Sequence, residues 1–406
     1  MSLLGSSHGY EWRSKSEFSM SQSATILNGN SPQAHDIKKT PRPRLFYLDL
    51  VRAIAVVLIF VTHFNNPALL AGPVVLAMTP FNIYIGDLGV SLFLIISGAA
   101  LMVSHGDKLE CKSFYWKRFK NIYPMFWLAW ILATGFFILA RGGFAANAGP
   151  PWSFVFTLLG IDGLVANFQI PTMYLLGEWF LGFIVVFYLV FPLLRWAVVE
   201  HPIVTSVIIL ALYAATLMYF DTPRAFPSSI ILTTRLPELA FGMYLAHYWK
   251  RITPWALIPA VGTLALWEIA PPTSDPGIAT TAVGISAFIV IVVLARFLDS
   301  QPVRALVGII ATYSYAIFLV HHVVIMQVFT GINPTGFTRT QVYAVFGATS
   351  LVIFGLSVAL HKLDANVVRF VTEAFRGTKF GWRREVSDPV TGSFEATDAA
   401  QTTRQA

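Results

Sequence analysis

Apolar runs long enough to cross a membrane recur along most of this chain, and this recurrence limits the folds that it can adopt. A helix needs about 20 apolar residues to cross a hydrocarbon core roughly 30 Å thick. Runs near this length fall at residues 45–64, 83–103, 122–140, 174–194, 203–220, 230–247, 255–270, 279–298, 306–328 and 342–361. The sequence therefore predicts an all-α polytopic membrane protein with about ten transmembrane helices.

Composition agrees with this fold class. Hydrophobic residues make up 55% of the chain and charged residues only 12%, which is about half the charged fraction of soluble domains. We expect residues 1–44 to be a disordered tail, residues 45–362 to be one membrane domain, and residues 363–406 to be a largely disordered tail. The apolar stretch Trp152 to Ile170 is expected to be interfacial or re-entrant.

The distribution of Lys and Arg predicts the orientation of the helices. Cytoplasmic loops retain Lys and Arg, and with both termini in the cytoplasm the outer loops hold only Arg141, Arg224 and Arg339. The net charge of +7 then reflects topology and anionic lipids, and not nucleic-acid binding. The single cysteine, Cys111, excludes an intrachain disulfide and is expected in a lysine-bearing cytoplasmic loop.

Ionisable residues inside the predicted spans mark a candidate site, because such residues are costly in a membrane. Arg52 and His63 share the first span, roughly 16 Å apart along a helix, so that Arg52 lies in the inner half and His63 near the outer end. The expected topology brings further ionisable residues to the outer level: Asp87, Glu178, Arg235, Glu238, His321 and His322.

These residue types suit acyl transfer to a hydroxyl, where a neutral His accepts the proton of the attacking alcohol and cations stabilise the oxyanion. His63 is the candidate base, and Glu178, Glu238 or Asp87 is a candidate to orient its ring. On the inner side, Lys117, Arg118 and Lys120 form a candidate site for the phosphates of an acyl-CoA. Ordinary retention of cations on the cytoplasmic side is the alternative explanation for that cluster.

Five motifs follow one another in order along the chain. The first is the spacing Arg52-x10-His63, and the others are Gly89-Val-Ser-Leu-Phe-Leu-Ile-Ile-Ser97-Gly98, Arg118-Phe-Lys-Asn-Ile-Tyr-Pro124, Arg235-Leu-Pro-Glu238-Leu-Ala-Phe-Gly242 and Ser314-Tyr-Ala-Ile-Phe-Leu-Val-His321. Over about residues 44–362, the chain thereby resembles the acyltransferase-3 family of membrane O-acyltransferases. Two positions depart from the family pattern, because Asn121 replaces an Arg of the third motif and Ile184 replaces a Glu five residues after Trp179.

The resemblance implies an enzyme of the plasma or inner membrane that moves an acyl group, commonly acetyl, from cytoplasmic acyl-CoA to a hydroxyl of a cell-surface polysaccharide or other envelope glycan or glycolipid. The candidate catalytic residues are His63, Arg52, Glu178, Arg235, Glu238 and His321. The candidate donor-binding residues are Arg52, Lys117, Arg118 and Lys120. No metal and no nucleic acid are expected, whereas the lipid bilayer and glycan-assembly proteins are candidate partners.

Structural explanations remain open for several of these residues. Arg52 pairs with Asp49 if the local i,i−3 contact forms, and Arg235 likewise has Glu238 as an i,i+3 partner. His63 could be an interfacial residue, packing could account for His321 and His322, and Ser97-Gly98 suits a close helix contact better than a nucleophile. A secondary transporter is the alternative function, because it would also gather His, Arg and Glu in the membrane. A third alternative is a structural partner in a glycan-assembly complex.

Overall fold

The computed structural model describes residues 45–69, 72–106, 108–143, 149–173, 175–176, 179–220, 228–249, 251–273 and 275–381. The predicted disordered tail at residues 1–44 lies outside this part of the chain, as do residues 382–406. The described residues form helices and no strand. They fall into a large unit that ends at His361 and a second unit that begins at Lys362.

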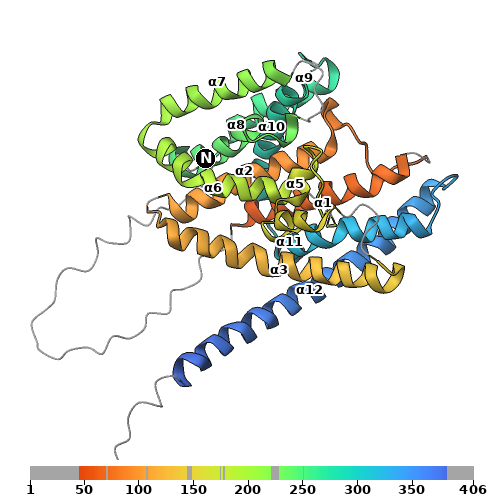
Figure 1. Ribbon diagram of the computed structural model, residues 1–406. Helices are drawn as coiled ribbons and strands as arrows, with labels where there is room; N and C mark the ends of the chain where they lie inside the picture. Colours follow the sequence, from red (N-terminus) through yellow and green to blue (C-terminus); the bar gives the residue numbers. More distant parts are fainter. Residues whose placement is uncertain are drawn as a thin grey trace, which may run out of the picture. The chain divides into compact units, whose positions relative to one another are not determined.

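Twelve α-helices follow one another along the described chain (Figure 1). They are α1 (Phe46–Leu69), α2 (Ile85–His105), α3 (Cys111–Arg141), α4 (Phe154–Leu158), α5 (Asp162–Ala166), α6 (Trp179–Glu200), α7 (Pro202–Phe220), α8 (Leu232–Tyr244), α9 (Leu257–Ile269), α10 (Pro276–Leu298), α11 (Gln301–Gly331) and α12 (Arg339–Gly381). Shorter helical turns are η2 (Pro80–Asn82), η3 (Pro151–Ser153), η4 (Ser228–Ile230), η5 (Leu245–Trp249) and η6 (Pro254–Ala256).

The all-α polytopic fold predicted from the apolar runs is confirmed. Among the described residues, 8 helices are long and apolar enough to cross a membrane. The other two predicted spans are also helical but shorter: the run at 230–247 becomes α8 followed by the π-helical turn η5, and the run at 255–270 becomes η6 and α9. The stretch Trp152 to Ile170, expected to be interfacial or re-entrant, contains the short helices α4 and α5.

Two helices extend beyond the apolar runs that predicted them. Helix α3 begins at Cys111, so this residue and the following lysines lie on a helix and the predicted loop is wrong. Helix α12 continues to Gly381, well past the predicted end at residue 361 and into the segment expected to be a tail. Hydropathy marks the part of a helix that suits lipid, whereas Lys, Arg and Glu are good helix formers and let the helix continue into water.

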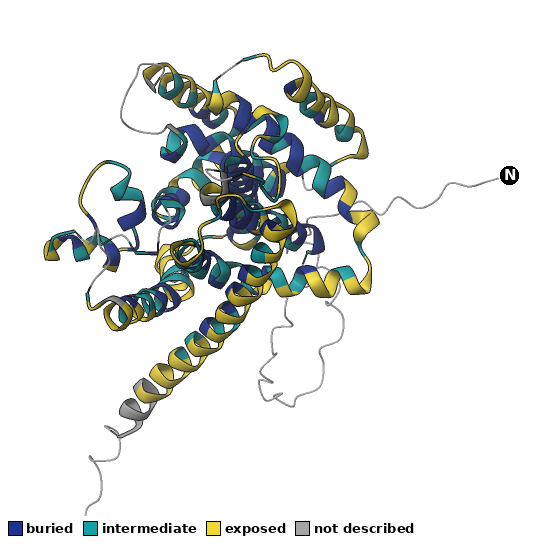
Figure 2. Cartoon of the chain, turned by 90° about the vertical axis from the view of Figure 1, so that its right-hand side faces the viewer, coloured by how far each residue is buried: buried dark blue, intermediate teal, exposed yellow. Residues whose placement is uncertain are grey.

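Helix α2 lies at the centre of the large unit and packs against α8, α1 and α10. Of the 18 most apolar consecutive residues in α2, 78% are buried, whereas only 11% are buried in the corresponding stretch of α7. Figure 2 shows the buried residues gathered on the central helices. Gly98 of α2 and Gly242 of α8 bring the two helices together, because a methyl group at either position would overlap a backbone oxygen of the other helix. This agrees with a close helix contact at Ser97-Gly98.

The peripheral helices expose large apolar side chains. Helix α7, for example, exposes Ile203, Val204, Val207, Ile208 and Leu210. A soluble protein rarely leaves such a continuous apolar surface in contact with water. The exposed apolar surface therefore suits contact with lipid, as expected for a membrane protein.

Candidate functional site

Among the cavities of the large unit, one is lined by His63 and another by Arg52. The His63 cavity has a volume of about 230 Å³ and is lined by Ile59, Thr62, His63, Tyr84, Gly86, Asp87, Val90, Phe93, Trp179, Phe180, Ser229 and Phe318. The Arg52 cavity has a volume of about 410 Å³ and is lined by Arg52, Phe93, Ile96, Ser97, Ala100, Leu101, Ser104, Arg118, Asn121, Ile122, Phe180, Leu181, Ile184, Tyr188, Ser314, Tyr315 and Phe318.

Helix α1 presents Arg52 and His63 from one face. His63 follows Arg52 by eleven residues, which is close to three turns of an α-helix and corresponds to roughly 16 Å along its axis. The Arg-x10-His spacing therefore points a guanidinium into one cavity and an imidazole into the other.

Three imidazole rings gather beside the His63 cavity. The ring centroid of His63 lies 5.0 Å from that of His321 and 5.3 Å from that of His322, and both contacts are edge-to-face. His63 is half-buried and lines the cavity, whereas His321 is only 1% exposed and lies behind it. The sequence motif favoured His321 over His322, but helix α11 brings both rings against His63.

The backbone of α11 sets the tautomer of the His321 ring. Its Nδ1 lies 2.8 Å from the carbonyl oxygen of Phe318 and 3.1 Å from that of Ile317. A carbonyl oxygen only accepts hydrogen bonds, so Nδ1 must carry a proton. In the neutral ring Nε2 is then an acceptor, which is the form that can orient the N–H of a neighbouring group.

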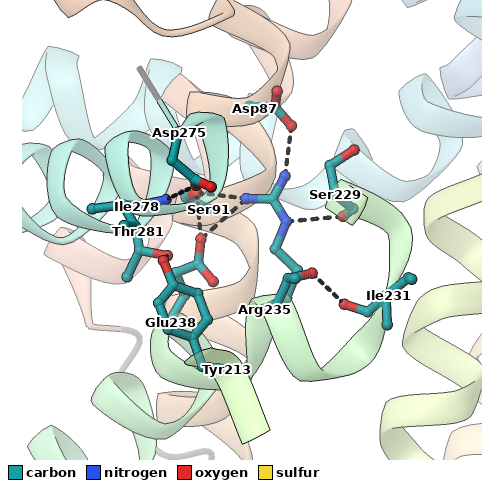
Figure 3. A network of polar contacts seen from close by, with 11 residues as sticks. Asp87, Ser91, Tyr213, Ser229, Ile231, Arg235, Glu238, Asp275, Ile278 and Thr281 are labelled. Carbon is teal, nitrogen blue, oxygen red and sulfur yellow. Dashed lines mark hydrogen bonds and ion pairs between the residues drawn. The ribbon is translucent and has the colours of Figure 1, made fainter. Parts of the chain in front are cut away.

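A buried ion network centred on Arg235 joins α8 to α2 (Figure 3). The guanidinium of Arg235 binds the carboxylate of Asp87 at 2.5 Å and that of Glu238 at 3.1 Å. It also donates to the backbone oxygen of Ser229 at 3.0 Å, and Ser91 donates its hydroxyl to Glu238 at 2.9 Å. Because the side chains of Arg235 and Glu238 are 3% and 0% exposed, the network must be internally paired to be stable.

Part of this network forms the surface of the His63 cavity, and the rest supports that surface from behind. Asp87 and Ser229 both line the His63 cavity, and Arg235 binds both of them from the protein side. Glu238 lies deeper and accepts hydrogen bonds from Arg235 and Ser91. The expected pairing of Arg235 with Glu238 is thus present. Glu178, the other acid proposed as a partner of His63, lies outside the described residues, although the adjacent Trp179 lines the cavity.

The Arg52 cavity combines two cations with hydroxyl and amide groups. Arg52 pairs with Asp49 at 3.2 Å, as its local spacing predicted, and its side chain remains 33% exposed. The guanidinium of Arg118 lies 5.6 Å from the ring centroids of both Phe114 and Tyr188. Its Nε is buried and donates no hydrogen bond to the described part of the chain. Two guanidinium groups that line one cavity can bind a phosphate.

The other two cations proposed for donor binding lie elsewhere. Lys117 and Lys120 are exposed on α3, and the Nζ of Lys120 lies 5.5 Å from the ring centroid of Trp116. Neither lysine lines the Arg52 cavity. In contrast, Asn121 and Ile184, the two positions that depart from the family pattern, both line it.

Sequence reasoning did not single out several polar residues of the two sites. Ser91 and Ser229 join the Arg235 network, and Tyr188 lines the Arg52 cavity. Hydroxyl groups are common in apolar helices, so their presence did not mark these residues as functional. Of the three, only Ser91 lies within one of the five motifs. Within the described residues, no group of three or more His, Cys, Asp or Glu side chains is placed to hold a metal ion.

Comparison with known proteins identifies the family. A family model described as an acyltransferase domain matches residues 45–361. Searches of the curated proteins and of the solved structures gave no significant match. The matched segment contains both cavities and covers most of the chain, and the protein therefore belongs to the acyltransferase-3 family of multi-pass membrane acyltransferases.

Proposed function

We propose that the protein is an O-acyltransferase of the plasma or inner membrane. It takes an acyl group, in the first instance acetyl, from cytoplasmic acyl-CoA and transfers it to a hydroxyl of an envelope glycan. A surface polysaccharide is our preferred acceptor, on the basis of family resemblance. Family membership supports acyl transfer over the alternative of a secondary transporter.

The Arg52 cavity is the proposed binding site for the phosphates of the donor. Arg52 and Arg118 provide two permanent positive charges beside Ser104 and Asn121, and guanidinium groups bind phosphate oxygens through paired hydrogen bonds. The buried Nε of Arg118 is a donor that a bound anion would satisfy. Lys117 and Lys120 are then left to attract the anionic donor to this end of the protein.

His63 is the proposed general base for the acceptor. Its neutral ring removes the hydroxyl proton as the hydroxyl oxygen attacks the carbonyl carbon of the thioester, so that a C–O bond forms. Collapse of the tetrahedral intermediate breaks the C–S bond, and the protonated His63 returns the proton to the departing thiolate. His321, held by the backbone of its own helix, is a positioning residue for His63.

The observation that carries the proposal is the placement of Arg52 and His63. One face of α1 directs an anion-binding group into one cavity and a base into an adjacent cavity roughly 16 Å away. An acyl-CoA has the same two parts, because its phosphates and its reactive thioester lie at opposite ends of a long pantetheine arm.

Mass analysis of surface glycans tests the proposal. Cells that lack the gene are complemented with wild type or with His63→Ala at matched membrane abundance, and ester-linked acyl groups are measured. We expect the ester to return with wild type and to fall about a hundredfold or more with His63→Ala.

His201→Ala is the matched control, because His201 is exposed at the end of α6 and lines neither cavity. Full modification by His63→Ala would exclude His63 as the base. Unchanged glycans in the deletion strain would exclude the acceptor class, and unchanged acyl esters throughout the cell would favour transport.

A further inference from the structure

Three phenylalanines line both cavities and so form a common wall between them. Phe93 comes from α2, Phe180 from α6 and Phe318 from α11, and each lines the His63 cavity on one side and the Arg52 cavity on the other. We call these three residues the phenylalanine partition. A donor whose phosphates lie beside Arg52 must reach His63 past these rings.

Phe180 is the central ring of the partition. Its centroid lies 5.7 Å from that of Phe93 and 6.0 Å from that of Phe318. These distances are typical of aromatic rings in contact, so little space remains between them. Removing the Phe180 ring would therefore open the partition more than removing either neighbour.

The chemistry of the partition suits an acyl chain. Its three rings present only apolar surface, whereas the walls on either side carry guanidinium, carboxylate and imidazole groups. The partition also lies directly beside the candidate catalytic residues, because the Phe318 centroid is 6.1 Å from that of His321. An apolar group placed among the rings would have its carbonyl end next to the histidine cluster.

We propose that the phenylalanine partition is the acyl-chain subsite of the enzyme and that Phe180 sets the length of chain that is transferred. This inference rests on the proposed acyltransferase function. The phosphates of the donor stay beside Arg52, the acyl chain lies among the three rings, and the acceptor hydroxyl approaches from the His63 cavity. Each methylene beyond the accommodated length must displace a packed ring, and one methylene changes the selectivity of a well-packed pocket by roughly 10- to 200-fold.

A competition assay with the full-length protein in lipid nanodiscs tests this assignment. Equal concentrations of acetyl-CoA, butyryl-CoA and hexanoyl-CoA are supplied together with envelope glycans from the deletion strain, and the masses of the esters formed are compared. In such a mixture the product ratio reports the ratio of kcat/KM values. We expect Phe180→Ala to raise the butyryl-to-acetyl ratio by about tenfold or more over wild type.

Phe183→Ala is the matched control. The Phe183 ring stacks on Phe180 from the next turn of α6, with a centroid distance of 6.4 Å, and it is 1% exposed. It lines neither cavity, so this variant loses a buried ring of the same size and should keep the chain-length ratio of wild type. Phe180→Leu and Phe93→Leu, which remove less volume, should give smaller shifts in the same direction and are used if Phe180→Ala does not fold.

Folded Phe180 and Phe93 variants that keep the wild-type ratio would overturn the assignment, as would an equal shift in Phe183→Ala. If the proposed acyltransferase function itself were wrong, wild type would form no ester from any of the three donors. If wild type forms esters and only the Phe180 and Phe93 variants change their chain length, the acyl-chain subsite is established.

Discussion

The rings of His63 and His321 lie edge to face, with their centroids 5.0 Å apart, although α1 and α11 are far apart in the sequence. His63 lines the cavity, whereas His321 is buried and fixed through Nδ1 to the carbonyl oxygen of Phe318. In the proposed mechanism, the His63 ring contacts the substrate and the His321 ring positions His63.

Two substitutions at His321 separate its two ring nitrogens. Asn can keep the hydrogen bond of Nδ1 to Phe318 but does not reach as far as Nε2, whereas the longer Gln can place an amide near the Nε2 position. We expect His321→Asn to lower kcat about a hundredfold and to leave the KM for acyl-CoA unchanged, with His321→Gln recovering part of the loss. The pH dependence of kcat should change as well, because the surroundings of His63 change.

A purely packing role for His321 would predict a different result. Both variants would then lose thermal stability, and the remaining folded enzyme would keep the kcat and the pH profile of wild type. Measuring the unfolding temperature and the pH–rate profile on the same preparations distinguishes the two roles.

Donor binding can be tested at two adjacent residues of α3. Arg118 lines the Arg52 cavity, whereas Lys117 is exposed and does not. We expect Arg118→Gln to raise the KM for acyl-CoA by about tenfold or more, because a charge-assisted hydrogen bond to phosphate contributes roughly 1.5–3 kcal/mol. Lys117→Gln removes the same charge and should change KM much less at physiological salt. Equal effects of the two variants would show that the cations act only through long-range attraction.

The buried network around Arg235 should dominate the stability of the His63 cavity wall. Arg235→Met leaves the carboxylates of Asp87 and Glu238 without their cation, which costs about 3–5 kcal/mol for a buried pair. Arg304→Met removes an arginine that pairs with Asp299 near the surface, where the Arg304 side chain is 54% exposed, and it should cost about 1 kcal/mol or less. Thermal unfolding in detergent measures both changes.

A double variant identifies the cause of this loss. Adding Glu238→Gln to Arg235→Met removes one uncompensated charge and should restore part of the lost stability. If the double variant is less stable than Arg235→Met alone, the loss reflects packing of the arginine side chain and not its charge.

Local spacing predicted the ion pairs that lie within one helix, but not the one that joins two helices. The pairs of Asp49 with Arg52 and of Arg235 with Glu238 both follow from residues three apart on a helix. The bond from Arg235 to Asp87 crosses from α8 to α2 and depends on how these helices pack. Sequence reasoning placed Asp87 at the same level as Arg235 and Glu238, but it could not choose its partner.

The proposed donor site likewise depends on helix packing that the sequence does not predict. Positive-inside counting treated Lys117, Arg118 and Lys120 as one cluster, because it places charges by depth and not by direction around the helix. In the structure, α3 turns Arg118 towards the cavity and leaves the two lysines exposed. This direction depends on how α3 packs against α6 and α11, which hydropathy does not predict.

The glycines at the contact of α2 and α8 should tolerate no side chain. A methyl group on Gly98 would overlap the backbone oxygen of Leu239, and one on Gly242 would overlap that of Ile95. We expect Gly98→Ala and Gly242→Ala each to destabilise the protein by about 1–3 kcal/mol or more. Gly135→Ala in α3 has no neighbouring atom within 4 Å and should be neutral or stabilising, by up to about 1 kcal/mol. Thermal unfolding of the three variants checks this, and equal losses would contradict it.

Asp162, at the start of α5, should make stability depend on pH in a predictable direction. Its side chain is buried, which raises the pKa of the carboxyl, although hydrogen bonds from the Gly163 amide and the Thr157 hydroxyl partly oppose this shift. A carboxyl with a raised pKa in the folded state binds more protons there than in the unfolded chain. Its contribution is therefore most favourable below the unfolded pKa and is lost as pH rises through the folded pKa. Asp162→Asn removes this titration, and its Oδ1 can still accept from the Gly163 amide while its Nδ2 donates to the Thr157 hydroxyl. The stability of this variant relative to wild type should therefore increase between acidic and neutral pH. Unfolding temperatures of the two proteins across this range test the prediction, and a difference that stays constant or shrinks with rising pH would show that Asp162 is ionised without penalty in the folded protein.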